Sequence, residues 1–164
     1  MENKLQIILL LLVVVFLQST IVPFFAIGMI QPDITLIFIA SIAIYSGQIP
    51  ATIIGFAIGV TLDLLSGEFF GLSAFTKTLT GFLVGYIYNE NRSEIIFSSY
   101  QYIVIVGVTA LVHNIIYFAI YTQGTSTTFL NAMIDAGFFS ALYTLTITFF
   151  PMIYFQRKKS SFIK

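Results

Sequence analysis

The sequence predicts an all-α integral membrane protein, with six transmembrane helices forming a single domain over residues 1–164. Hydrophobic residues make up 58% of the chain and charged residues only 9%, whereas a soluble domain carries about 25% charged residues. Long apolar segments alternate with short polar turns, and several of these segments approach the length of about 20 residues that a membrane-spanning helix needs. A chain this poor in charge cannot cover a surface in water with polar groups, so we expect it in a lipid bilayer.

The composition also limits the kinds of chemistry that the chain can perform. The chain has no Cys, which excludes disulfides, thiolate metal sites and cysteine nucleophiles. Its one histidine is His113, and no nucleophile-and-base arrangement, phosphate loop or metal-ligand spacing is present. We therefore expect no enzymatic activity, no metal or cofactor, and no nucleic-acid partner. Because Trp is absent, Tyr and Phe must supply any aromatic belt at the membrane surfaces.

The first apolar run, residues 5–25, is interpreted as a retained transmembrane helix. A cleaved signal peptide is the alternative, since Lys4 precedes an apolar core of suitable length from Leu5 to Leu17. No small-residue cleavage site follows this core, and the apolar run continues to Phe25, which favours a helix that ends near Pro23.

The second and third segments, residues 34–45 and 51–65, are short for membrane spans. Asp33 is placed to cap the first of them, because Asp accepts hydrogen bonds from the free N–H groups at a helix start. Pro50 falls in the first turn of the next helix, where its missing N–H costs nothing. A re-entrant pair that does not cross is the alternative, but the distribution of charge favours two crossings.

The remaining predicted helices cover residues 71–88, 100–121 and 129–155, with Pro151 expected to kink or fray the end of the last one. Polar loops lie at 89–94 and 122–128. Six crossings place both termini on one side of the membrane. All basic residues in loops and tails then share that side: Lys4, Arg92, Arg157, Lys158, Lys159 and Lys164. The positive-inside rule makes this side the cytoplasm.

Two stripes of small residues mark the third and fourth helices. Each stripe repeats every fourth residue and so lies on one side of its helix; the stripes are Ala51, Gly55, Gly59 and Asp63, and Ser73, Lys77, Gly81 and Gly85. An antiparallel hairpin about Glu68 would pair Asp63 with Ser73, Gly59 with Lys77, Gly55 with Gly81 and Ala51 with Gly85. Small residues let helix backbones approach closely in a membrane, so we expect the stripes to pack together and to serve helix packing or partner binding.

The same region carries ionisable residues at membrane depth. We expect Lys77 to reach along the Gly59 groove toward Asp63, either as a ligand or ion site or as an ion pair that only fixes the hairpin register. Two hypotheses describe the environment of Asp135 on the sixth helix. In one it joins Asp63 and Lys77 in a cluster, and in the other it lies hydrated in the membrane interface. For His113, a hydrogen bond across helices is favoured over a proton relay.

The hairpin region resembles a known family. The residues that carry the resemblance are Gly55-Phe56-x-x-Gly59-x-x-x-Asp63-Leu64-Leu65-Ser66-Gly67, then Gly71-Leu72-Ser73-Ala74, then Gly81-x-x-x-Gly85. This pattern is similar to that of the bacterial rod shape-determining protein MreD. The resemblance implies a fold like the six-helix substrate-binding subunits of energy-coupling-factor transporters, and a non-enzymatic subunit of the cell-elongation (rod) complex in the bacterial inner membrane.

The resemblance also implies partners. It suggests a contact with the transmembrane helix of MreC within the lipid bilayer. It also suggests a link between MreB filaments and peptidoglycan synthesis by RodA and its transpeptidase. A homodimer is a further alternative that the sequence does not decide. The alternative is a vitamin-binding transporter subunit. Such subunits resemble one another in an Ala-x-x-x-Ala stripe on the first helix, whereas residues 5–20 here contain no Ala or Gly. An ion or proton transporter is a third class, disfavoured because Asp63 and Asp135 are expected near the outer face.

Overall fold

The computed structural model describes residues 2–28, 30–67 and 69–161. The described chain is helical, apart from its turns and an isolated antiparallel bridge between Ile27 and Ile30. The α-helices are α1 (Glu2–Phe16), α2 (Ile34–Ser46), α3 (Gln48–Ser66), α4 (Leu72–Val84), α5 (Ser93–Phe97), α6 (Tyr100–Tyr121), α7 (Phe129–Ala132) and α8 (Phe139–Ser161). Two π-helices, η1 (Leu17–Ile21) and η5 (Met133–Phe138), and three 3₁₀ turns, η2 (Val22–Phe25), η3 (Gly85–Ile87) and η4 (Thr122–Gly124), extend or join them. The predicted all-α class is confirmed.

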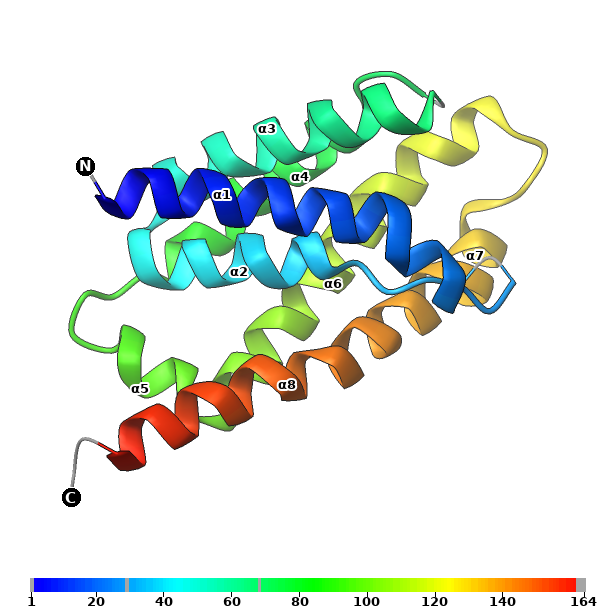
Figure 1. The fold of residues 1–164 in the computed structure, drawn as a ribbon. Coiled ribbons are helices and arrows are strands. Elements are labelled where there is room, and N and C mark those ends of the chain that lie inside the picture. The colour runs from blue at the N-terminus through cyan, green and yellow to red at the C-terminus, as the bar shows by residue number, and fades with distance from the viewer. Residues whose placement is uncertain (1, 29, 68, 162–164) are drawn as a thin grey trace.

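The long helices run back and forth between two ends of the molecule (Figure 1). One end, here called the terminal end, holds the start of α1, the end of α8, the α2–α3 turn and the α4–α5 connection. The other, here called the hairpin end, holds the α3–α4 turn and the α6–α7 loop. The turn between the two glycine-bearing helices therefore lies opposite the end of the basic C-terminal helix.

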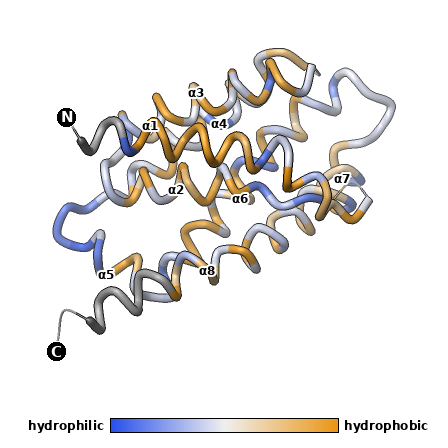
Figure 2. Tube along the Cα trace, in the orientation of Figure 1, coloured by the Kyte–Doolittle hydropathy of each residue, from blue (hydrophilic) through white to orange (hydrophobic). Residues whose placement is uncertain are grey.

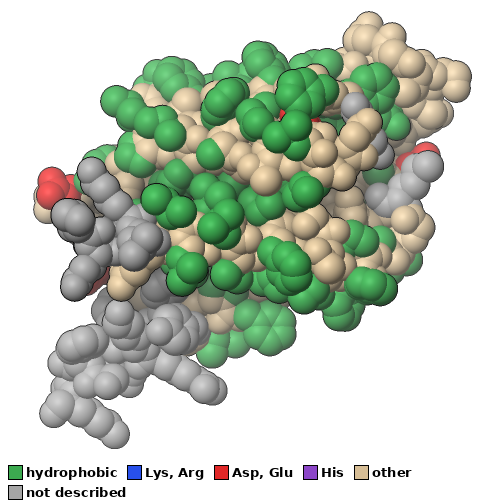
Figure 3. All heavy atoms as spheres, turned by 45° about the horizontal axis from the view of Figure 1, so that its top comes forward, with side chains coloured by type: hydrophobic (Ala, Val, Ile, Leu, Met, Phe, Trp, Pro, Cys, Tyr) green, Lys and Arg blue, Asp and Glu red, His purple; other side chains and the backbone are tan. Residues whose placement is uncertain are grey.

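Four helical segments are long and apolar enough to cross a membrane: residues 6–25, 48–66, 100–124 and 129–153. Helix α2 is apolar but shorter. Hydrophobic residues follow α1, α2, α6 and α8 over most of their length, and the strongest hydrophilic stretch connects α4 to α5 (Figure 2). The surface over α1 and α3 is correspondingly covered with hydrophobic side chains, and acidic ones lie mainly at the two ends (Figure 3). Length and composition thus support four of the six predicted spans.

Several boundaries differ from the predicted ones. Helix α3 begins three residues early, at Gln48, because Pro50 is tolerated in its first turn, where a backbone N–H would have no acceptor within the helix. Pro151 does not end the last helix, which continues to Ser161. The predicted 89–94 loop leads into α5, which the sequence did not indicate; the Ser93 hydroxyl anchors α5 by donating to the carbonyl oxygen of Ile44, 2.7 Å away. Glu68 and Lys164 lie outside the described residues.

Helix α2 forms the centre of the bundle. It packs against α1, α3, α4, α6 and α8, and its side chains from Thr35 to Ile44 are mostly buried, with Ile39, Ala40 and Ala43 fully so. Such a helix is apolar on all sides, so its sequence shows no amphipathic pattern. Because neighbouring helices surround α2, protein covers most of its length although the helix is shorter than a membrane span.

Candidate functional site

Helices α3 and α4 are in backbone contact along their glycine stripes. A Cβ atom added at Gly55 would lie 2.5 Å from the carbonyl oxygen of Lys77, and one added at Gly81 would lie 2.5 Å from that of Ala51. Further along, a Cβ at Gly59 would lie 2.3 Å from the Cα atom of Ala74. Only glycine fits at such distances, because the opposing atoms belong to the backbone and cannot rotate away.

The two stripes face each other, as the spacing predicted, but the predicted register is wrong by about one turn. Gly55 faces Lys77 instead of Gly81, and Gly59 faces Ala74 instead of Lys77. At the terminal end, the residue that faces Gly85 is Gln48 and not Ala51, with a Cβ-to-Cα distance of 2.3 Å.

The carboxylate of Asp63 joins α3 to the start of α4 at the hairpin end, and its contact with Ser73 is the part of the predicted register that the structure keeps. This carboxylate accepts hydrogen bonds from the backbone N–H groups of Gly71 (2.9 Å), Ser73 (3.0 Å) and Ala74 (3.0 Å). These are orphan donors at the start of α4, where the helix dipole also favours a negative charge. Asp63 is only 3% exposed, and its three hydrogen bonds hold the first turn of α4 against α3. The Asp63–Lys77 ion pair expected from the sequence does not form.

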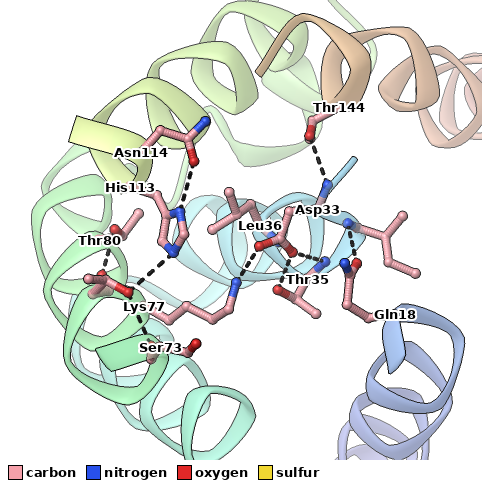
Figure 4. Close-up of polar contacts among 12 residues, drawn as sticks. Gln18, Asp33, Thr35, Leu36, Ser73, Lys77, Thr80, His113, Asn114 and Thr144 are labelled. Carbon is pink, nitrogen blue, oxygen red and sulfur yellow. Dashed lines mark hydrogen bonds and ion pairs between the residues drawn. The ribbon is translucent and has the colours of Figure 1, made fainter. Parts of the chain in front are cut away.

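Lys77 instead pairs with Asp33, across the bundle from α4 to the start of α2 (Figure 4). The Lys77 side chain is 3% exposed and that of Asp33 is 19% exposed. Asp33 also caps α2 as predicted, accepting from the N–H groups of Thr35 (2.9 Å) and Leu36 (3.3 Å). The sequence analysis missed this ion pair because the two residues lie in separate segments and Asp63 appeared to be the nearer acid.

Two further polar side chains hold the start of α2. The Gln18 amide in η1 accepts from the N–H of Ile34 (2.8 Å) and donates to the carbonyl oxygen of Pro32 (3.1 Å). The Thr144 hydroxyl in α8 accepts from the N–H of Asp33 (2.9 Å). No pattern marks these residues in the sequence beyond the rarity of a polar residue such as Gln18 inside an apolar run.

The extended segment before α2 is bonded in the same way. The Ser140 hydroxyl donates to the carbonyl oxygen of Gln31 in this segment, and the Tyr143 hydroxyl donates to that of Phe25, the last residue of η2, at 3.2 Å. Non-helical backbone is tolerated at membrane depth only where protein groups satisfy it. Side chains of η1 and α8 therefore allow α2 to start well inside the bundle.

A second set of polar side chains, linked by hydrogen bonds, joins α4, α6 and η5. The His113 ring contacts the Thr76 hydroxyl through Nε2 and the Asn114 amide oxygen through Nδ1, both at 3.2 Å. The Asn114 amide nitrogen donates to the carbonyl oxygen of Gly137 at 2.6 Å. His113 is thus placed in a hydrogen bond between helices, next to the Lys77–Asp33 pair (Figure 4).

Asp135 lies apart from this polar core. Its side chain is exposed on η5, and Lys77 is engaged by Asp33, so the hypothetical Asp63–Lys77–Asp135 cluster does not form. Among the described residues, every buried side-chain nitrogen or oxygen has a hydrogen-bond partner, and no three His, Asp or Glu side chains gather as a metal site would require. The polar core is therefore satisfied by the chain itself.

The apolar helices and the internally paired charges define a helical membrane protein whose polar residues hold its own helices together. Comparison with known protein families matches residues 1–155 to the family described as rod shape-determining protein MreD. The chain belongs to this family, and it is thus a membrane protein of the rod shape-determining class. No curated protein and no solved structure matches it.

Proposed function

We propose that this chain is a non-enzymatic scaffold subunit of the rod complex in the bacterial inner membrane. In this role it binds the transmembrane helix of MreC and helps to couple MreB filaments to peptidoglycan synthesis by RodA and its transpeptidase. The observation that carries the proposal, beside family membership, is the closed centre of the bundle: α3 and α4 touch along their backbones, and the Lys77–Asp33 pair joins α4 to α2. A rigid bundle of this kind is suited to present its outer surface to other helices.

The closed centre favours a scaffold over the alternative, a vitamin-binding subunit of an energy-coupling-factor transporter. A substrate site is a cavity with a few converging polar groups, and a helix start is an attractive place for an anionic substrate. Here the start of α2 is occupied by the carboxylate of Asp33, which is itself paired with Lys77. The likeness to the fold of those transporter subunits stays a prediction.

We further propose six crossings with both termini in the cytoplasm. Helix α2 rises about 20 Å at 1.5 Å per residue, against a hydrocarbon core of about 30 Å. The bonded residues 30–33 before α2 extend its crossing, and α4 crosses as the partner of α3 in the hairpin. The basic residues of the loops and tails then lie on one side, as the positive-inside rule requires.

The proposal is tested by photo-crosslinking in cells that express the full chain with MreC. A photoreactive amino acid is placed at one exposed position on each of five outer helices: Leu12 on α1, Phe56 on α3, Phe75 on α4, Val108 on α6 and Phe149 on α8, which are 57%, 55%, 54%, 45% and 51% exposed. Ile58, fully buried on α3, is the matched control.

The expected result is a crosslink to MreC from one or two adjacent helices and none from Ile58. Crosslinks from no helix, together with loss of MreC on purification in mild detergent, would refute the scaffold role. A vitamin that co-purifies with the chain would support the transporter alternative instead.

A further inference from the structure

Exposed aromatic side chains are distributed unequally between the two ends of the molecule. At the terminal end four of the exposed rings are tyrosines, Tyr45, Tyr86, Tyr88 and Tyr100, which are 68%, 70%, 40% and 71% exposed. Phe82, 41% exposed, packs edge-on against Tyr86 there. At the hairpin end the exposed rings are phenylalanines, among them Phe24, Phe25, Phe69 and Phe70, which are 85%, 60%, 49% and 72% exposed. Tyrosines also occur toward the hairpin end, but there Tyr121 and Tyr143 are half-buried.

The four exposed tyrosines come from separate elements that meet at the same end. Tyr45 lies in the last turn of α2, Tyr86 in η3, Tyr88 directly after η3, and Tyr100 at the first position of α6. The ring of Tyr88 lies against the α2–α3 turn, 3.3 Å from the position of a Cβ on Gly47. The tertiary structure thus gathers residues spread over the sequence into one group, here called the tyrosine girdle.

The surface changes in polarity on either side of the girdle. Toward the centre of the bundle the exposed residues are apolar, among them Ile53, Leu83 and Val104. Beyond the girdle lies the exposed polar stretch from Asn89 to Arg92, which leads into α5 with its exposed Ile95, and the exposed Ile49 and Ile87 lie at the level of the girdle itself. Tyrosine has an apolar ring and a polar hydroxyl, and it favours the headgroup level of a membrane, between hydrocarbon and water.

We propose that the tyrosine girdle binds the headgroup layer of the bilayer and fixes the depth of the protein from its terminal end. The occupant is the lipid surface and not another protein chain, because the order from polar stretch to tyrosine to aliphatic residue follows the polarity of a bilayer. With the girdle at one headgroup layer, the 13 residues of α2 place Asp33 about 20 Å farther in. The Lys77–Asp33 pair then lies within the hydrocarbon, where it is shielded only by protein. This proposal does not depend on binding to MreC.

The absence of Trp makes a direct test possible, since a single introduced Trp is the only indole in the chain. Three variants, Tyr45→Trp, Tyr86→Trp and Tyr100→Trp, are reconstituted separately as the full chain in phospholipid vesicles. The vesicles contain lipids brominated either near the glycerol or near the end of the acyl chain. Phe56→Trp, on an exposed position of α3 about 12 Å along the helix from Gln48, is the matched control. All four substitutions exchange one exposed aromatic ring for another, so the bundle is not repacked.

The expected result is a greater loss of fluorescence with the shallow label for all three tyrosine positions, and a greater loss with the deep label for Phe56→Trp. Stronger quenching of the tyrosine positions by the deep label would overturn the proposal, as would three positions that report different depths. Rings that neither label quenches would be covered by protein or lie in water, and this result would overturn it as well.

Discussion

The close packing of α3 against α4 makes Gly59→Ala the most informative single substitution. The added Cβ would lie 2.3 Å from the Cα of Ala74 and 2.5 Å from the carbonyl oxygen of Ser73, whereas ordinary contact begins at 3.4 Å. Both opposing atoms belong to the backbone, so the two helices must separate locally by about 1 Å, which is the difference between these distances.

This separation occurs one turn away from Asp63. The three hydrogen bonds that its carboxylate accepts, at 2.9, 3.0 and 3.0 Å, would lengthen toward about 4 Å, beyond hydrogen-bonding distance. Hydrogen bonds to charged groups contribute about 1.5–3 kcal/mol each, so losing all three costs about 4.5–9 kcal/mol. That is a large part of the total stability of a typical domain, about 5–15 kcal/mol.

The measurement is the thermal stability of the full chain in detergent, followed as the fraction of a fluorescent fusion that stays monodisperse after heating. The expected decrease in Tm for Gly59→Ala is about 10 °C or more, with lower abundance in the membrane. Gly107→Ala on α6 is the matched control, because its Cβ would meet only the flexible Leu145 side chain, at 3.2 Å. Both variants gain the same helix propensity, about 1 kcal/mol, so this contribution cancels in the comparison. A Gly59→Ala variant as stable as the unchanged chain would refute the argument, and so would equal damage from Gly107→Ala.

The other polar contacts give three further predictions. Asp63→Ala should lower membrane abundance by leaving three buried N–H groups at the start of α4 unpaired; normal abundance with lost rod-complex function would point to a binding role for this residue instead. Lys77→Met and Asp33→Asn should each destabilise the chain, by about 3–5 kcal/mol, because each variant leaves the charge of the other residue unpaired within the bundle. In a double-mutant cycle the double variant should lose less than the sum of the two, and strict additivity would show that the ion pair contributes nothing. Gln18→Leu should cost about 1–3 kcal/mol because it removes both hydrogen bonds to the backbone around α2, while Gln6→Leu, at an exposed position of α1, should be neutral in the same melting assay.

Periodicity and composition were sufficient to predict the helical class and the facing of the two glycine stripes. Apolar runs predict helices because a bilayer leaves the backbone few other ways to satisfy its hydrogen bonds. A glycine on every fourth residue predicts a flat side on a helix, whatever its partner is. The N-cap at Asp33 was predictable for the same reason, since it depends only on the next three residues.

Register and charge pairing could not be predicted in this way. The stripe on α3 repeats at the same interval as the stripe on α4, so a shift of one turn again places each glycine against the backbone of the other helix, and periodicity cannot choose between the two arrangements. The hydrogen bonds that Asp63 accepts from three N–H groups at the start of α4 depend on the three-dimensional path of the turn, which spacing along the chain does not give.

By itself, the sequence determined that this protein is a membrane-embedded helical bundle with two closely packed glycine helices, because those features follow from local spacing and solvent. Only the tertiary structure decided that Lys77 is neutralised by Asp33, and that Gln18 and Thr144 support the start of α2. The physical reason is that a buried charge accepts any opposite charge within reach, and reach is set by how all the helices pack, not by distance along the chain.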